Sequence, residues 1–428
     1  MARHVCAGRS VLVDVPVVLI ADDLTGAAEA AAAFVLRTPR IVDLDALRSV
    51  RTSLDAGVTA VDTDSRYVGP ELAAERCRTA LALLPPSGVV VKKIDSTLRG
   101  PLAAELAEVR EPGGLLVVAP ALPALGRTVI GGAVLVDGVP LERSAAWAAE
   151  PRPAPASVAE ALAPLPVSVV PLPAVRGGVD ELAAALWAAA EGGRVPVCDA
   201  ETEGDLDRVV GAGRLVARSG RTVRWAGSAG LALALARAQV AAADPPHGTE
   251  GGGLPAPPPV GPILFVVGTA APAAREQLAW LAAHVATVVE LDPDQLADPA
   301  ATAHDVAART AGRTAVVQLT DAGGAARSPD VVAALARVVE PAARDHPGLV
   351  LTGGETARAV LAALGVGELR VREAWDDGVV VSTARGGRVV VTKPGAFGDP
   401  RVLVRIAQRL ASTRWHVHAE HSPHEEDT

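Results

Sequence analysis

The sequence predicts an α/β protein of two domains, each a mainly parallel sheet flanked by helices. Short runs of Val, Ile and Leu recur along the chain, and each run ends at a cluster of Asp, Ser, Thr, Arg, Lys or Gly. Such runs are typical of strands that are buried on both faces of a parallel sheet. Alanine-rich segments of good helix formers lie between them, and this alternation favours parallel strands with right-handed crossovers. A chain of 428 residues is longer than a single hydrophobic core usually accommodates, which favours more than one domain.

The expected elements follow one another in order along the chain. Strands are expected at the apolar runs 17–20, 58–61, 89–91, 115–119, 263–267, 349–351 and 389–391. Helices are expected at the alanine-rich segments 26–36, 70–84, 230–242, 273–284 and 356–364. Ligands of open α/β sheets bind at the carboxyl ends of the strands, so the polar clusters that follow these runs are the candidate functional groups.

A Pro- and Gly-rich segment at 243–261 predicts a linker, because its composition supports neither helix nor sheet. We therefore expect an N-terminal domain over 1–242 and a C-terminal domain over 262–415. The polar tail at 416–428 is expected to be disordered.

The net charge of −9 and the pI near 5.6 argue against a nucleic-acid or anionic-membrane partner. The three cysteines are scattered without disulfide or zinc spacing, which favours a reducing cytoplasm. No run approaches the roughly 18–20 apolar residues of a membrane span. The sequence thus predicts a soluble cytoplasmic protein with small-molecule partners, no nucleic acid and no membrane, and it leaves the oligomeric state open, a homodimer included.

Asp22, Asp23 and Thr25 lie between an expected strand and an expected helix. Two adjacent carboxylates at such a junction can bind a polyol, hold Mg²⁺ or act as a general base. Helix capping is the alternative, because Asp and Thr are good N-cap residues. Capping requires only one such residue, so the cluster favours a functional site.

Asp62, Asp64, Ser65 and Arg66 repeat this pattern after the next expected strand of the N-terminal half. An arginine beside two aspartates indicates either an internal ion pair or a site for a carboxylate-bearing polyol. We favour the second interpretation.

The densest cluster, KKIDSTLRG, begins at Lys92. This lysine and the one after it point to opposite sides of the strand. Arg99 can hold a carboxylate bidentately, and Asp95 and Ser96 can bind hydroxyls. A solvated strand end followed by a turn is the alternative. A proline-rich loop after the following strand places Arg127 near the same edge.

Glycine corners dominate the C-terminal half. Backbone N–H groups at a glycine-rich helix N-terminus can bind an anion, and three such corners at strand ends favour a phosphate-bearing ligand. The candidate residues are Gly268, Thr269, Gly353, Gly354, Glu355, Thr356, Lys393, Gly395 and Gly398. No P-loop and no GxGxxG fingerprint is present. The segment WAGSAGL at 225–231 fits either a close approach to a ligand or tight helix packing.

Read in order, these segments resemble the four-carbon acid sugar kinase family. The matching stretches are ADDLTGA, DTDSR, KKIDSTLRG, PALPALGRTV, VLVDGVPLERS, GSAGLA, LTGGETARAVLAALG and TKPGAFGD, which span residues 20–399. The resemblance implies an N-terminal domain that binds a sugar acid, a C-terminal domain that binds ATP, and an active site in the cleft between them. It implies phosphoryl transfer to the terminal hydroxyl of an acid such as a threonate, erythronate or 3-oxo-tetronate.

Three positions depart from the family pattern. The first nucleotide corner keeps a hydroxyl at Thr269 but lacks the second one, Pro394 replaces a serine, and Glu150 stands where an Asp is usual. These changes leave the main charged groups in place.

The kinase hypothesis assigns a role to each cluster. Arg99, Lys92 and Arg127 would bind the substrate carboxylate or the transferring phosphoryl group. Substrate hydroxyls would bind to Asp95, Asp64 and Ser96, with Thr25, Asp62, Ser65 and Arg66 in the same site. Asp22 or Asp23 would be the base and the other would lie near Mg²⁺, while the glycine corners would hold ATP. A non-catalytic sugar-acid sensor and a different ATP-using enzyme, such as a ligase, are the alternatives.

Overall fold

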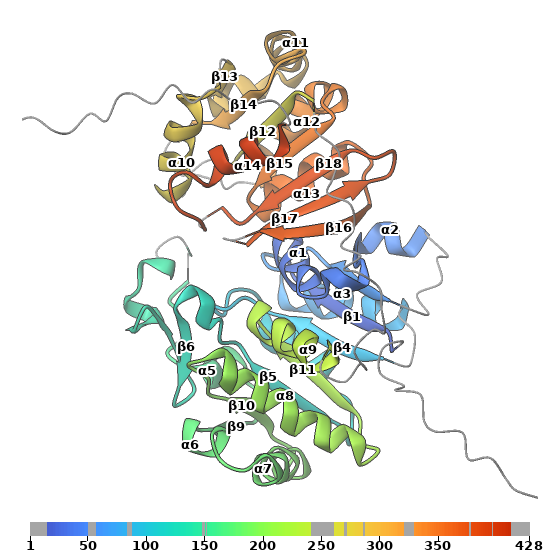
Figure 1. Cartoon of the computed structure of the whole chain (residues 1–428), viewed down its shortest axis with the longest axis vertical. Helices are drawn as coiled ribbons and strands as arrows, with labels where there is room; N and C mark the ends of the chain where they lie inside the picture. The colour runs from blue at the N-terminus through green and yellow to red at the C-terminus, as the bar shows by residue number, and fades with distance from the viewer. Residues whose placement is uncertain are drawn as a thin grey trace, which may run out of the picture.

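The computed structural model describes residues 15–49, 57–83, 88–147, 150, 152–240, 261–268, 272–285, 287–320, 329–375, 378–395 and 397–411. These residues form two α/β lobes, with the N-terminal lobe in blue to green and the C-terminal lobe in yellow to red (Figure 1). The predicted fold class is confirmed. Apart from Gly261, the expected linker lies outside the described residues, as does the tail at 416–428. No helix in the described ranges is long and apolar enough to cross a membrane.

The N-terminal lobe contains a parallel sheet with the strand order β2-β3-β1-β4-β11-β5-β10-β9. Its strands are β1 (Val17–Ala21), β2 (Arg40–Asp43), β3 (Val58–Asp62), β4 (Val89–Lys93), β5 (Leu115–Ala119), β9 (Val167–Val170), β10 (Val195–Cys198) and β11 (Val223–Gly227). A small antiparallel sheet contains β6 (Arg127–Ile130), β7 (Ala133–Val136) and β8 (Val139–Pro140). Strands β1, β3 and β5 are buried along their whole length, which explains the continuously apolar sequence of β1 and β5.

Helices cover the sheet of the N-terminal lobe (Figure 1). They are α1 (Leu24–Ala32), α2 (Leu44–Ser49), α3 (Pro70–Leu83), α4 (Leu102–Val109), α5 (Val158–Ala161), α6 (Leu172–Val175), α7 (Val179–Glu191), α8 (Glu203–Arg218) and α9 (Ala229–Val240). The connections β1–α1, β3–α3 and β4–α4 carry the polar clusters that the sequence analysis selected.

The C-terminal lobe has the strand order β13-β14-β12-β15-β18-β17-β16, of which β16, β17 and β18 pair antiparallel. The strands are β12 (Ile263–Val267), β13 (Thr287–Leu291), β14 (Ala315–Leu319), β15 (Gly348–Thr352), β16 (Glu368–Trp375), β17 (Val379–Ala384) and β18 (Val389–Lys393). The helices are α10 (Pro272–Ala282), α11 (Pro299–Thr310), α12 (Pro329–Asp345), α13 (Gly354–Ala363) and α14 (Val402–Leu410).

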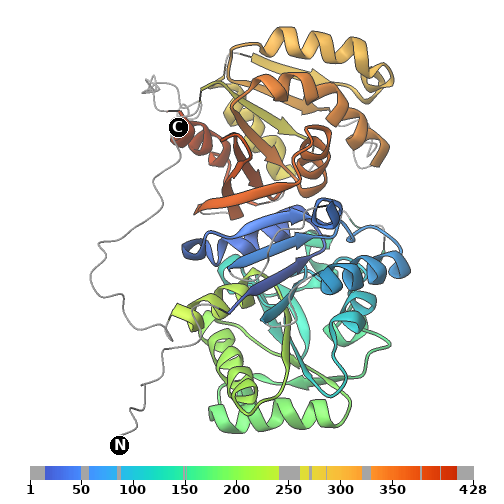
Figure 2. The same ribbon diagram turned by 90° about the vertical axis from the view of Figure 1, so that its right-hand side faces the viewer.

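The sheets of the two lobes are joined into one 15-stranded sheet by antiparallel pairing of β2 with β16. Ile41 lies opposite Leu369 in this pairing. The Asp43 N–H donates to the Gly367 carbonyl at 3.0 Å, which extends the ladder by one bond. In the side view, the orange strands of the C-terminal lobe lie against the blue elements of the N-terminal lobe (Figure 2). The lobes are therefore attached by backbone hydrogen bonds as well as by the chain between them.

The small residues of WAGSAGL serve tight packing. A Cβ on Gly230 would lie 2.7 Å from the Ala121 carbonyl oxygen and 2.9 Å from Leu206 Cδ1. The Ser228 hydroxyl donates to the same carbonyl at 2.5 Å, so α9 begins directly against the end of β5. Of the two interpretations of this segment, the described contacts support helix packing.

We expect Gly230→Ala to lower the free energy of unfolding by about 1–3 kcal/mol, because the added methyl group would overlap a backbone oxygen that cannot rotate away. Gly204→Ala is the matched control, since Gly204 has the same position in α8 and its Cβ would have only Thr202 Oγ1 nearby, at 3.7 Å. Denaturant unfolding of both variants tests this explanation, and equal shifts of the two midpoints would contradict it.

Candidate functional site

The carboxyl ends of β3, β1 and β4 bring the predicted N-terminal clusters together. These strands are neighbours in the sheet. β3 ends at Asp62, β1 ends one residue before Asp22, and β4 ends two residues before Asp95. All three carboxylates are buried. The topology thus gathers acidic groups from distant parts of the sequence at one edge.

Arg66 binds both adjacent aspartates. Its Nε and Nη2 donate to Asp22 Oδ2 and Oδ1, each at 2.8 Å, and Nη2 also donates to Asp23 Oδ1 at 2.6 Å. Burial alone would raise the pKa of Asp22, but the charge and hydrogen bonds of Arg66 outweigh it and lower this pKa. Asp22 is therefore held as a carboxylate, with both oxygens bound to a guanidinium.

Asp23 has two functions in the structure. It caps α1, because Oδ1 accepts from the Gly26 N–H at 3.0 Å and Oδ2 accepts from the Thr25 hydroxyl. It also meets the other lobe, since a Cβ built on Gly354 would lie 2.6 Å from Asp23 Oδ2 and 3.2 Å from Thr25 Oγ1. The capping and functional interpretations of this residue are thus compatible.

Arg99 forms a bidentate pair with the carboxylate of Asp95. Nε and Nη2 donate to Oδ2 and Oδ1 at 2.8 Å each, and the Thr97 N–H donates to Oδ2 at 3.1 Å. Burial opposes ionisation, but the Arg99 pair holds the pKa of Asp95 well below its usual range. Glu150, at a position of family departure, lies in the same cluster, because it is 3.9 Å from Arg99 Nη1 and accepts from the Tyr67 hydroxyl at 3.3 Å.

Arg127 connects this cluster to the C-terminal lobe. Its Nη1 donates to Ser96 Oγ at 2.6 Å, and its guanidinium stacks on the Phe397 ring at 4.6 Å from the centroid. Its buried Nε has no hydrogen-bond partner among the described residues. Burial lowers the pKa of Arg127. A buried donor of this kind fits an anionic ligand group.

Lys92 and Ser65 lie beneath the site. Both are fully buried. Lys92 Nζ is 3.0 Å from Glu105 Oε1, to which the Ser65 hydroxyl donates at 2.5 Å. Although burial disfavours an ammonium, the carboxylates of Glu105 and Asp22 raise the pKa of Lys92. Both side chains thus contact a buried carboxylate, and their contact with the substrate stays a prediction.

Glu29 is a candidate site residue that the sequence analysis missed. It lies 3.7 Å from Lys93, which points away from Lys92 as expected for successive strand residues. Burial raises the pKa of Glu29, and the charge of Lys93 opposes the rise. Its position four residues after Thr25, on the same face of α1, is the signal that would have revealed it.

Arg358 of α13 contacts three carboxylates of the N-terminal lobe. Nη1 lies 2.6 Å from Asp43 Oδ2 and 2.8 Å from Asp62 Oδ2, and Nε lies 3.2 Å from Asp64 Oδ2. Asp62 and Asp64 thus form the internal ion pair that the sequence left as the alternative, but with an arginine of the other lobe. No local sequence pattern marks Arg358, because its partners are distant in the sequence; Asp62, for example, lies 296 residues before it.

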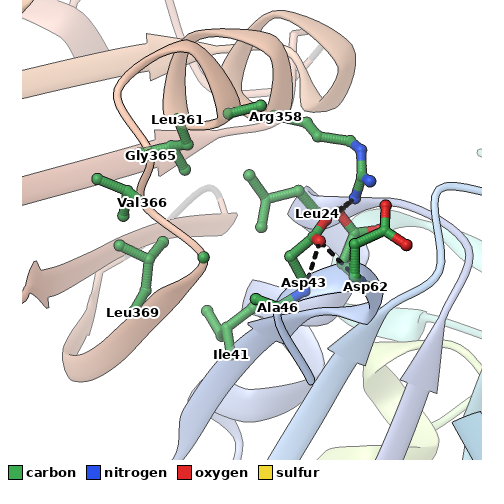
Figure 3. Close-up of a pocket in the computed structure, with 13 residues that line it drawn as sticks. Leu24, Ile41, Asp43, Ala46, Asp62, Arg358, Leu361, Gly365, Val366 and Leu369 are labelled. Carbon is green, nitrogen blue, oxygen red and sulfur yellow. Dashed lines mark hydrogen bonds and ion pairs between the residues drawn. The ribbon is translucent and has the colours of Figure 1, made fainter. Parts of the chain in front are cut away.

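A pocket of about 350 Å³ lies beside these ion pairs (Figure 3). Its wall is mainly apolar and comes from both lobes, while Arg358 and acidic side chains form one end. The residues lining it are Leu24, Ile41, Asp43, Asp45, Ala46, Asp62, Arg358, Leu361, Ala362, Gly365, Val366, Gly367 and Leu369.

The glycine corners of the C-terminal lobe meet at the ends of the neighbouring strands β12, β15 and β18. Gly353 caps α13 with a φ of +92°, a conformation that favours glycine, and no side chain caps this helix. A Cβ on Gly268 would overlap Thr356 Oγ1, so the corner at Gly268 lies directly beside the corner at 353–356. The third touches as well, because the Gly353 N–H donates to the Lys393 carbonyl at 2.9 Å.

The remaining nucleotide candidates differ in their placement. Lys393 is buried, and its ammonium donates to the Pro394 carbonyl at 2.7 Å. Gly395 lies in the turn that follows, and the Gly398 carbonyl accepts from Gln277 Nε2 at 2.8 Å. Glu355 is exposed at the start of α13. Thr269 lies outside the described residues.

We expect Lys92→Met to lower the free energy of unfolding by about 3–5 kcal/mol, because Glu105 would be left buried without a cation. The double variant Lys92→Met/Glu105→Gln should recover part of this loss, and thermal unfolding measures both. A stable Lys92→Met protein whose only defect is a raised KM would instead show direct contact with substrate.

Asp62 predicts a pH dependence of stability. Burial raises its pKa from 3.8 to about 7, although Arg358 opposes the rise. The folded state therefore binds the proton more tightly, so this contribution to stability is full below about pH 4 and is lost as the pH rises through about 7. We expect the Tm of the wild type, relative to Asp62→Asn, to fall between about pH 4 and about pH 8. Asp207→Asn, at an exposed ion pair with Arg237, is the control. If the Tm of the wild type relative to Asp62→Asn rises with pH, the raised pKa of Asp62 is refuted.

Two family models match the chain. One is described as a sugar-binding N-terminal domain and matches residues 17–235. The other is described as a nucleotide-binding C-terminal domain and matches residues 264–403. The first includes the acidic strand ends, and the second includes all of the candidate residues of the glycine corners.

Curated relatives match over nearly the full length. A D-threonate kinase of Cupriavidus necator is 38% identical over 419 residues, which cover 92% of this chain and 98% of that protein. A D-erythronate kinase of Heliobacterium modesticaldum is 30% identical, covering 91% and 93%. A 3-oxo-tetronate kinase of Methylobacterium radiotolerans is 30% identical, covering 92% and 98%.

Solved structures share the fold. A Salmonella typhimurium LT2 protein has a TM-score of 0.73 at 22% identity, covering 91% of this chain and 98% of its own. Haemophilus influenzae protein HI1011 has a TM-score of 0.65 at 19% identity, covering 92% and 100%. The family models and the curated relatives show that the chain belongs to the four-carbon acid sugar kinase family and is a phosphotransferase that acts on an alcohol group.

Proposed function

We propose that this protein transfers the γ-phosphoryl group of ATP to the terminal hydroxyl of a four-carbon sugar acid, such as D-threonate, erythronate or 3-oxo-tetronate, in sugar-acid catabolism. The observation that carries the proposal is the close approach of Gly354 to Asp23, because it brings the glycine corner of α13 near the acidic cluster of the other lobe, as expected for a nucleotide next to a sugar acid. The names of the curated relatives supply the substrate class. The division at the linker, the cytoplasmic location and a homodimeric state stay predictions.

The residues present fit a bound sugar acid. Arg127 has a buried Nε without a hydrogen-bond partner in the described part of the chain, and it lies between Ser96 and Phe397, at the boundary of the lobes. We assign it to the substrate carboxylate or the transferring phosphoryl group. Asp95 is held ionised by Arg99, so it can accept hydrogen bonds from substrate hydroxyls.

Asp23 is the better of the two candidate bases. Both oxygens of Asp22 are bound by Arg66, and its lowered pKa makes it a weak proton acceptor. Asp23 Oδ2 faces Gly354, and among the described residues it accepts a hydrogen bond from Thr25 alone. We propose that Asp23 accepts the hydroxyl proton and that Asp22 lies near Mg²⁺. Glu29, whose pKa burial raises, is the next candidate for the base.

The residues of the C-terminal lobe fit a nucleotide. Gly353, at positive φ and without a side-chain cap, lets the first N–H groups of α13 face a phosphate. ATP would supply the phosphoryl group, with Mg²⁺ neutralising the phosphate charge. Mg²⁺ bound through phosphates needs only one or two protein carboxylates, which the aspartate pair can provide. Thr269 stays assigned to this corner as a prediction.

The test is release of ADP by the purified protein with a panel of threonates, erythronates and 3-oxo-tetronates, with and without Mg²⁺. We expect turnover that requires both the metal ion and one of the acids. Asp23→Asn keeps a good N-cap residue, so it should fold while kcat falls by about 100- to 10,000-fold, the range for loss of a general base. Asp207→Asn is the surface control. Folded wild-type protein that binds an acid without any turnover would favour the sensor alternative.

A further inference from the structure

Arg358 of the C-terminal lobe forms three ion pairs with the N-terminal lobe. Its guanidinium lies within 3.2 Å of Asp43, Asp62 and Asp64. The Asp62 side chain is 2% exposed and that of Arg358 is 21% exposed, so at least one of these pairs is shielded from water. Shielding makes the attraction stronger than that of a surface pair, and it makes loss of one partner costly.

The position of Arg358 on α13 relates these ion pairs to the nucleotide corner. Gly354 is the first residue of α13, and Arg358 follows four residues later on the same face. The helix therefore meets the N-terminal lobe at two points one turn apart, at Asp23 through Gly354 and at the three carboxylates through Arg358. Helix α13 packs on α12, β15 and β18 of its own lobe, so two contacts constrain the placement of this lobe on the other more than one contact would.

Buried apolar side chains of both lobes pack in one cluster at this boundary, but a pocket interrupts that packing beside the second contact. The pocket of about 350 Å³ lies between the lobes, with Ile41 of the N-terminal lobe and Leu361 of α13 in its wall (Figure 3). An unfilled space forfeits dispersion contacts, so the side chains around it attract one another less than they would in a filled core. At the charged end of the pocket, Arg358 bridges Asp43 and Asp62 and adds an electrostatic attraction between the two lobes.

We propose that Arg358 is a positioning residue of the kinase, which holds the N-terminus of α13 over Asp23 and thereby aligns the nucleotide corner with the sugar-acid site. This inference rests on the proposed function. It gives Asp62 and Asp64 a role different from binding substrate hydroxyls, since both are bound to Arg358. Lysine cannot replace the arginine fully, because one ammonium lacks the planar fork whose Nε and Nη1 reach different carboxylates.

The main test is Arg358→Met, which keeps the apolar stem and removes the charge. We expect kcat to fall by about 10- to 100-fold, the effect of misplacing reacting groups by around 1 Å, while the KM for the sugar acid changes little. Arg358→Lys should recover part of kcat. Arg40→Met is the matched control: Arg40 pairs with Glu368 at 4.0 Å across the same β2–β16 junction. It lies at the amino end of β2, level with Val18 of β1, whereas Asp23 follows the carboxyl end of β1. This control variant should keep kcat within about twofold.

Hydrogen exchange without ligands separates this proposal from the proposed function. Arg358→Met should speed exchange in the first turn of α13 and at the Asp43 amide, which bonds to Gly367, and should leave β5 unchanged. The exchange result stands even if no acid is turned over, in which case only the kinase assignment fails. Equal kcat losses in Arg358→Met and Arg40→Met, exchange unchanged in α13, or faster exchange throughout the N-terminal lobe would each overturn the positioning role.

Discussion

The buried carboxylates at the ends of β1, β3 and β4 impose the constraint on which the rest of the site depends. An ionised carboxylate is costly to bury unless a cation and hydrogen bonds accompany it. Each acidic group here has such a partner: Arg66 binds Asp22, Arg99 binds Asp95, and Lys92 binds Glu105. For Asp62 the cation comes from the other lobe. The need to neutralise buried carboxylates thus extends from the candidate site across the boundary between the lobes.

These charge pairs also explain how two neighbouring aspartates acquire different properties. Arg66 binds both oxygens of Asp22, which stays a carboxylate. Both oxygens of Asp23 bind its own helix, and Oδ2 also faces Gly354. The same cluster therefore organises the local backbone and leaves one acceptor at the lobe boundary. Structural and chemical roles are shared between adjacent residues, as a compact strand–helix turn requires.

Much of this arrangement could be predicted from the sequence, because parallel strands end at a common edge and the apolar runs before Asp22, Asp62 and Asp95 mark those strands. The glycine corners followed from the same rule. Side-chain partners could not be predicted in this way. The burial of Lys92 against Glu105 depends on the packing of α4, which local pattern does not report. Strands β2 and β16 were also missed, because β2 has only two apolar residues between charged ones and charged residues interrupt β16. Their pairing with each other joins segments that are distant in the sequence.

The shared ladder of β2 and β16 has a consequence for the evolution and handling of such chains. Family models treat the two halves as separate units, yet in the folded protein each half completes the edge of the other. An isolated half would present a row of unsatisfied backbone donors and acceptors, which is a template for self-association. Recombination or truncation between the two halves would therefore yield fragments that self-associate through the exposed strand edge. This constraint favours keeping both halves in one polypeptide.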